Sequence, residues 1–138
     1  MTVQFTIVNI GTLSMNKFWG ETARVRSATA TCVLLATAGQ RLLVDPSPGP
    51  DELAPMLFAR TGLRPADIDS IFLTHFHGDH RYGLELFGNA TWWMAEPGLQ
   101  EWQACSPQDS GLIDRFVPAD ERLLAGVRLY PSPGHTFG

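Results

Sequence analysis

Three histidines and one aspartate lie within six consecutive residues, at His75, His77, Asp79 and His80. Imidazole nitrogens and carboxylate oxygens are the ligands that a borderline cation such as zinc prefers. In an extended segment, the alternation of His75 and His77 directs both imidazoles to the same side. A catalytic zinc usually takes three protein ligands, so four such groups indicate two adjacent metal ions.

The fourth and last histidine of the chain, His135, lies in the sequence PSPGHT at residues 131–136. It follows a strand-like stretch, residues 126–130, just as the first three follow a hydrophobic one. The alternative is that these are surface or core histidines with no common task. The concentration of all four histidines after two strand-like stretches favours the metal site.

The elements that must position these side chains form an alternating pattern. Residues 69–74 contain the apolar core Ile71-Phe72-Leu73 and predict a short buried strand, so the histidine-rich run leaves its carboxyl end. Open α/β sheets place their chemistry at that edge. The rest of the chain predicts an α/β fold, with further strands at 3–8, 28–37, 41–45, 90–95, 112–117 and 122–130, and helices at 54–61, 82–87 and 98–104.

The pattern H-x-H-x-D-H after a hydrophobic strand, with Gly134-His135-Thr136 further on, resembles the metallo-β-lactamase superfamily of metal-dependent hydrolases. The stretch LLVDPSPG at residues 42–49 is similar to the first motif of that family, a strand that ends in an aspartate and a glycine-bearing turn. The resemblance implies a metallo-β-lactamase-like αβ/βα sandwich, of which this chain holds the N-terminal half.

By this resemblance, His75, His77 and His135 would hold one metal ion. Asp79 and His80 would contribute to a second, and Asp79 would also be a catalytic residue.

The same resemblance makes Asp45 an acid that orients a ligand imidazole without binding the metal itself. The alternative for Asp45 is a turn or helix-capping residue, because an aspartate before a proline is a common turn signal.

Two departures from the family pattern stand out. Residues 81–84 read Arg-Tyr-Gly-Leu, where the family usually has a small, glycine-rich turn. The chain also stops at Gly138, whereas the family continues into a second half that supplies a bridging aspartate and a last histidine. Half a sandwich would expose an apolar sheet face, so we expect the chain to be an incomplete gene product, a fragment, or a protein that completes itself through a partner. The isolated chain is expected to self-associate through that face.

Composition bounds the chain as one globular domain, residues 1–138, with 44% hydrophobic and 17% charged residues. A net charge of −4 and the lack of a basic cluster argue against nucleic acid or an anionic membrane as partners. A small-molecule substrate fits better. The N-terminus has no signal-peptide pattern, and a cytoplasmic location is expected.

Residues 11–28 mix glycine, polar residues and aromatics without a clean period, which predicts a long loop or loose hairpin. Phe18 and Trp19 within it are either a flap over the substrate or core residues. The adjacent tryptophans Trp92 and Trp93 must face opposite sides of their strand. Cys32 lies in an apolar strand and is interpreted as a buried free thiol.

The predicted function is hydrolysis of a small-molecule ester, thioester, lactone or lactam by a zinc-bound hydroxide, since zinc lowers the pKa of its water from ~15.7 to about 7. One tight zinc site and one incomplete site are expected, and iron or manganese would accept the same ligand types. The alternative is a metal-binding fragment or interaction protein with little or no catalytic activity. The net negative charge argues against a nuclease, because nucleic acid is itself negatively charged. His77 argues against a di-iron redox protein, since the relatives of that kind carry a glutamate at this position.

Overall fold

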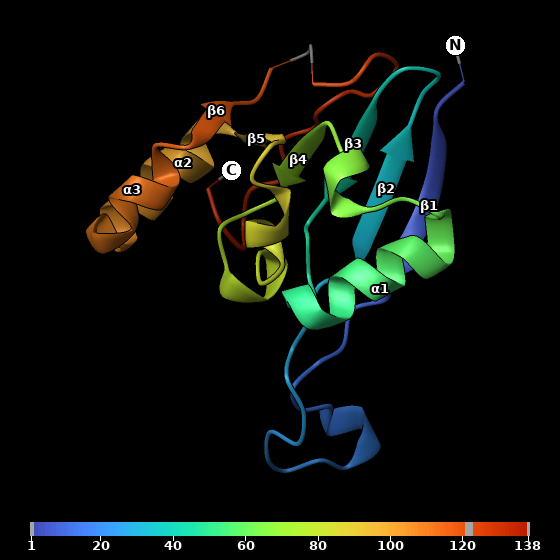
Figure 1. Ribbon diagram of the computed structural model, residues 1–138. Helices are drawn as coiled ribbons and strands as arrows, with labels where there is room; N and C mark the ends of the chain where they lie inside the picture. Colours follow the sequence, from blue (N-terminus) through green and yellow to red (C-terminus); the bar gives the residue numbers. More distant parts are fainter. Residues whose placement is uncertain (1, 121–122, 138) are drawn as a thin grey trace.

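A computed structural model describes residues 2–120 and 123–137, and within them one mixed sheet of six strands runs in the order β1-β2-β3-β4-β5-β6. The first three strands pair antiparallel and the last three join in parallel, so the sheet combines a hairpin edge with a parallel half. Figure 1 shows this arrangement. The strands are β1 (Gln4–Asn9), β2 (Cys32–Ala36), β3 (Arg41–Val44), β4 (Ser70–Leu73), β5 (Thr91–Met94) and β6 (Phe116–Pro118).

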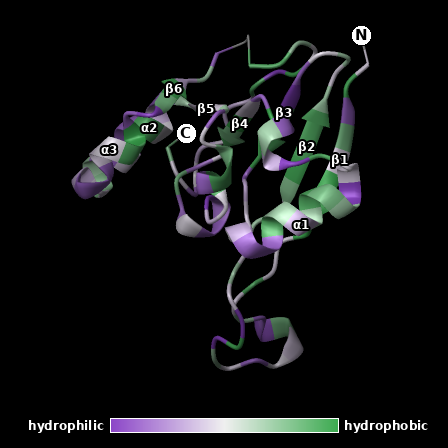
Figure 2. Cartoon of the chain, viewed as in Figure 1, coloured by the Kyte–Doolittle hydropathy of each residue, from purple (hydrophilic) through white to green (hydrophobic). Residues whose placement is uncertain are grey.

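One face of the sheet packs against helices α1 (Pro50–Thr61) and α2 (Glu96–Cys105) and the 3-10 turn η4 (Leu84–Phe87). Alternate residues of the central strands point into this core, and Figure 2 shows β2 and β4 largely in green. The shared core consists of apolar residues from these elements, among them Leu34, Leu43, Leu53, Leu57, Ile71, Leu73, Phe87, Met94 and Trp102. The prediction of an α/β fold is confirmed.

Helix α1 begins at Pro50, with Asp51 and Glu52 in its first turn, so the expectation of a start nearer Ala54 than Asp51 is wrong. Gly49 precedes the helix, and a proline in its first position lacks only an N–H that would have had no partner there. Pro55 lies inside the helix, beyond its first turn, and lacks the N–H that would bond to the Asp51 carbonyl. At the other end Gly62 adopts a left-handed conformation, and its N–H bonds to the Phe58 carbonyl.

The opposite face of the sheet is apolar as well. Leu42 is buried beneath Leu123 and Leu124, and the partly buried Phe72 and Trp93 pack against the same cluster. Trp92 lies in the other core, so the two tryptophans do face opposite sides of β5 and both pack against apolar residues. The segment 123–130 therefore covers part of a face that the helices leave open.

Two strand predictions near the C-terminal end are wrong. Residues 112 and 113 belong to a short helix, α3 (Ser110–Ile113), whose Ile113 packs into the core, and the strand starts only at Phe116. Within the predicted strand 122–130, residue 122 lies outside the described residues. Residues 123–130 contact the sheet through Leu123, Leu124 and other side chains, without backbone pairing to a strand.

Residues 10–28 form a loop that projects from the sheet past α1 (Figure 1). It is closed at its base by an isolated bridge between Thr12 and Thr29, and it contains the 3-10 turn η1 (Lys17–Trp19). Phe18 is 99% exposed and Trp19 is 74% exposed, so the interpretation of both as core residues is wrong. Their role as a flap over a substrate stays a prediction.

In the described part of the chain, no helix is long and apolar enough to cross a membrane. Cys32 is fully buried in β2, as predicted, and burial raises the pKa of its thiol to about 12. The thiol therefore stays neutral and serves as a small apolar core residue.

Candidate metal centre

The histidine-rich run leaves the carboxyl end of β4 and turns back at the 3-10 turn η3 (Gly78–His80). Because β4 lies between β3 and β5 in the parallel half of the sheet, this is the edge at which the loops after β3 and β4 meet. A backbone bond from Asp45 to the carbonyl of Phe72 holds the end of β3 beside β4. The sheet thus delivers the first motif and the histidine run to one place.

Three imidazoles converge here. One ligand atom from each of His75, His77 and His135 lies within 4.8 Å of the other two. His135 Nε2 lies 3.0 Å from His77 Nδ1, and the His75 ring is edge-on to both other rings at centroid distances of 4.7 and 4.9 Å. Ligands around a tetrahedral zinc with bonds of about 2.0–2.1 Å are separated by about 3.3 Å. The cluster is therefore close to the spacing that a metal requires.

His75 has the environment of a metal ligand. Burial, with the neighbouring His80 and His77 imidazoles, lowers its pKa to about 4, so the ring is neutral at pH 7. Its Nε2 atom is buried and has no hydrogen-bond partner among the described residues. A buried polar atom without a partner costs about 1–3 kcal/mol, and a metal ion would remove that cost.

A chain of hydrogen bonds fixes the protonation of His75. The Thr74 hydroxyl donates to Asp45 Oδ2 at 2.8 Å, so its single proton is used. His75 Nδ1 lies 3.2 Å from that hydroxyl oxygen and must therefore be the donor of the pair. With its proton on Nδ1, His75 presents a free lone pair at Nε2.

Asp45 is the centre of this network. It is 4% exposed, has a positive φ of 49°, and accepts a further bond from the Thr74 backbone N–H at 2.8 Å. His80 Nδ1 lies 2.9 Å from Asp45 Oδ2, and since a carboxylate only accepts, the imidazole donates. Asp45 therefore contacts His80 directly and His75 through Thr74.

The pKa of His80 is shifted in the opposite direction from the pKa of His75. Burial alone lowers its pKa, but the hydrogen bond and charge of Asp45, together with the charge of Asp79, outweigh burial and raise the pKa above its usual value. Its ring lies 3.9 Å from the His75 ring, centroid to centroid. His80 is thus adjacent to the three-histidine cluster without belonging to its set of converging ligand atoms.

Asp79 lies in the wall of a recess of about 380 Å³ between the ligand loop and the base of the loop 10–28. Its backbone carbonyl accepts a bond from the Ala30 N–H at 3.1 Å, which ties the two loops together. The other walls include Arg24, Arg26 and Tyr82. The lining of this recess includes Asp79 but none of the four histidines.

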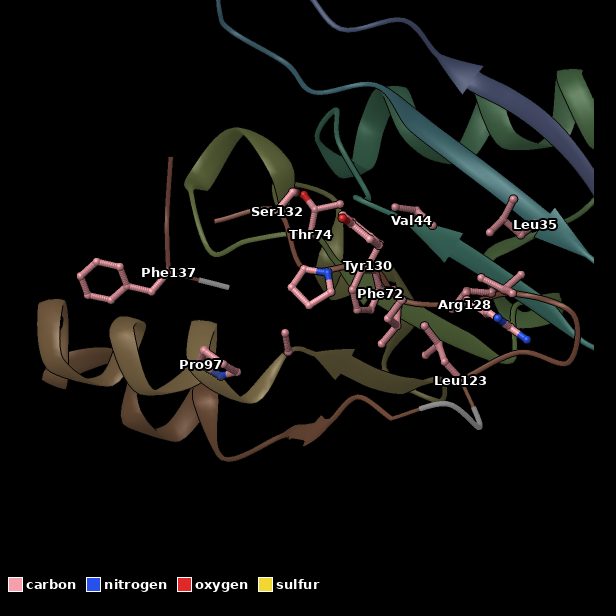
Figure 3. Close-up of a pocket in the computed structure, with 15 residues that line it drawn as sticks. Leu35, Val44, Phe72, Thr74, Pro97, Leu123, Arg128, Tyr130, Ser132 and Phe137 are labelled. Carbon is pink, nitrogen blue, oxygen red and sulfur yellow. The ribbon is translucent and has the colours of Figure 1, made fainter. Parts of the chain in front are cut away.

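Thr74, which the sequence alone does not single out, bonds to both Asp45 and His75. The sequence places Thr74 at the end of the strand and next to His75, but a single threonine there matches no motif that would indicate a role for its hydroxyl. The structure also shows an apolar cavity of about 400 Å³ behind the ligand loops (Figure 3), bounded by the open sheet face and residues 127–132. Thr74 is one of the few polar groups that line it.

A family profile described as Metallo-beta-lactamase superfamily matches residues 28–138. The chain belongs to the metallo-β-lactamase superfamily. The match contains the whole histidine run, Asp45 and His135, so the family motif and the observed cluster coincide.

Two relatives in the superfamily are 31% identical to this chain. One is an atrochrysone carboxyl ACP thioesterase of Emericella nidulans, aligned over 75% of this chain and 32% of its own. The other is a ribonuclease Z of Pseudomonas putida, aligned over 80% of this chain and 35% of its own. The chain therefore spans about a third of the length of these relatives.

Solved structures confirm the predicted fold class. AiiA of B. thuringiensis superposes with a TM-score of 0.65 at 19% identity, over 99% of this chain and 67% of that protein. At this identity the likeness concerns the fold alone. The six-stranded sheet with its helices corresponds to one half of the metallo-β-lactamase sandwich.

Proposed function

We propose that this chain is the zinc-binding part of a hydrolase that cleaves a small-molecule ester, thioester, lactone or lactam. The observation that carries the proposal is the convergence of three imidazoles around His75 Nε2, a buried atom without a partner in the described structure. Three neutral imidazoles suit zinc, and they leave a fourth position for chemistry.

His75, His77 and His135 would hold the metal, which when bound supplies Lewis-acid polarisation of a carbonyl and a nucleophile at neutral pH. The protein's own contribution is orientation. Asp45 and Thr74 keep the His75 proton on Nδ1, so that Nε2 faces the cluster. Asp79 precedes His80 in the chain and borders a recess, and we assign it the handling of protons on the substrate side.

Asp79 and His80 would contribute to a second metal ion. The proposal is supported by the position of His80 beside His75 and by the bond from His80 Nδ1 to Asp45, which leaves its Nε2 for a ligand. Two protein ligands hold a metal more weakly than three, so this second site is expected to be weak.

The proposed substrate class rests on the net charge of the chain and on the names of its two relatives. A net charge of −4 opposes a polyanionic substrate, although one relative is named as a ribonuclease. The other relative is named as a thioesterase, and acyl transfer to water is the reaction that a polarised carbonyl favours. We therefore place thioesters and esters first.

A second candidate is a metal-binding or interaction protein with little turnover. It is favoured by one observation, that the ligand atoms of Asp79 and His80 do not join the converging set. Without a second metal, the substrate's developing charge would have fewer stabilising groups.

The uncovered part of the sheet face supports self-association as a partner proposal. Phe5 and Ile7 of β1 are 71% and 43% exposed, next to the partly buried Leu35 of β2. Burial of such residues contributes roughly 25 cal/mol per Å² of apolar area. Light scattering at rising concentration tests this: we expect dimers, with a shift toward monomers in Phe5→Ser, and a wild-type monomer at all concentrations would contradict it.

The function is tested with zinc-loaded protein and a panel of aryl esters, acyl thioesters and lactones. We expect zinc-dependent hydrolysis that is lost in His135→Ala. The exposed Gln103→Ala variant is the control for handling and folding. A wild-type protein that binds zinc stoichiometrically without any turnover would favour the second candidate, and one that binds no zinc would overturn both.

A further inference from the structure

We propose that helix α2 positions the three-histidine centre by holding both of its ligand-bearing segments at once, with Arg81 and Glu101 as positioning residues. The inference rests on the proposed function only in that the cluster binds a metal ion. It concerns residues outside the H-x-H-x-D-H motif, and Arg81 stands where the sequence departs from the family pattern.

The first contact holds the segment between His75 and His77. Phe76 lies between these two ligands in sequence, and its ring stacks on the buried Trp102 of α2 at a centroid distance of 5.9 Å and an interplanar angle of 14°. Trp102 is itself fixed, because its indole N–H donates to Asp109 Oδ2 at 2.9 Å. A rigid aromatic platform therefore supports the backbone that carries two ligands.

Arg81 completes this support from the other end of the turn. Its Nε donates to the Phe76 carbonyl at 2.8 Å, and its guanidinium lies 4.7 Å from the centre of a Trp102 ring. An ion pair of 3.6 Å to Asp109 holds the same guanidinium. Arg81 thus bonds directly to the peptide between the two ligands, while Trp102 and Asp109 determine where the guanidinium sits.

The second contact holds the segment of His135. Glu101, the neighbour of Trp102 on α2, accepts a hydrogen bond from the Phe137 backbone N–H at 2.7 Å. Figure 3 shows Phe137 beside α2, and Phe137 and Pro97 line the same cavity. His135 is exposed, and residues 131–137 have no helix or strand of their own. The Glu101 contact is therefore a tether two residues from the third ligand.

These contacts matter because the two ligand segments are far apart in the chain. His77 and His135 are separated by 58 positions, and their rings meet at a centroid distance of 4.7 Å. Ordering a segment of the chain upon metal binding costs conformational entropy for each residue that is fixed. Adjacent residues of one helix remove that cost for both segments before the metal arrives. Outer groups of this kind typically change metal affinity 10–100-fold.

The test measures zinc affinity by competition with a chromophoric chelator, and in parallel the urea midpoint of the metal-free protein. We expect Arg81→Met and Glu101→Ala each to weaken zinc binding about 10-fold or more, with an urea midpoint close to wild type. Arg81→Lys should recover part of the loss, because an ammonium still donates to a carbonyl, and Glu101→Gln should recover most of it. Arg60→Met on α1 and Gln103→Ala on α2, both exposed, are matched controls.

Two results would overturn the inference. One is unchanged zinc affinity in Arg81→Met and Glu101→Ala. The other is a loss of affinity that tracks a fall in urea midpoint and is not recovered by the conservative variants, which is the signature of a structural role. If Arg81→Met does not fold, the Glu101 pair decides. Failure of the proposed function shows differently, as absence of zinc binding in the wild type.

Discussion

The three-histidine cluster and the Asp45–Thr74–His80 network lie side by side but are built in opposite ways. In the network, a buried carboxylate accepts bonds from a backbone N–H, a hydroxyl and an imidazole. In the cluster, the His75 Nε2 atom has no partner in the described structure, and His135 Nε2 faces His77 Nδ1 at 3.0 Å. The network is satisfied by the protein alone, whereas the cluster is completed only by something added.

Removing a ligand of the three-histidine cluster should have the largest effect on zinc affinity. We expect His77→Ala to weaken zinc binding by more than about 100-fold, beyond the 10–100-fold range of outer groups, because one of three protein ligands is lost. Atomic absorption after dialysis against metal-free buffer measures the stoichiometry. Full zinc content in this variant would show that the metal lies elsewhere, and Gln103→Ala provides the control.

A titration of zinc into metal-free protein sharpens the comparison. Calorimetry should resolve one tight and one weak site, separated by roughly 100-fold, because the first has three ligands and the second only Asp79 and His80. Asp79→Ala should remove the weak phase and leave the tight one. Two sites of equal affinity would mean that the two groups do not act separately.

The sequence-based predictions agree best with the structure where a run of apolar residues forms a buried strand. The short strand before His75 follows from its apolar core Ile71-Phe72-Leu73 alone, and the burial of Cys32 follows from its apolar neighbours. For residues 123–130 the predicted strand is wrong because alternating apolar residues look the same in sequence whether they pair in a sheet or cover one. Thr74 was missed because a hydroxyl becomes functional only through the geometry of Asp45, which is 29 positions away.

Thr74 links the two regions, and removing its hydroxyl tests that link. Thr74→Val keeps the shape of the side chain but breaks the bonds to Asp45 Oδ2 and His75 Nδ1. We expect zinc affinity to fall about 10-fold, at the lower end of the range for outer groups, since the imidazole itself remains. Thr74→Ser should restore it. An unchanged affinity in Thr74→Val would show that His75 needs no such orientation.

The last expected effect is on stability as a function of pH in metal-free protein. The lowered pKa of His75, about 4, means that the unfolded chain binds the extra proton first, so stability falls as pH drops from about 6.5 toward 4. The raised pKa of His80 acts in reverse: its contribution is present below about 6.5 and is lost as pH rises through the raised value.

Stability should therefore peak near pH 6.5, with His75→Asn flattening the acid side and His80→Asn the alkaline side. Urea unfolding at a series of pH values, with zinc removed by chelation, measures both. A profile that rises steadily from pH 4 to pH 8 in the wild type would contradict the opposite tuning of the two imidazoles.

The two edge strands of the sheet, β1 and β6, differ in how readily they can pair with another strand. At β6 the pairing row is only three residues long and ends in Pro118, which has no N–H to donate, and Arg115 flanks it with a charge. At β1 the row is six residues long and proline-free, with Phe5 and Ile7 exposed on one side. Edge-to-edge growth into larger sheets would therefore proceed from β1. A lysine at position 5 or 7 is the substitution that would protect this border from aggregation.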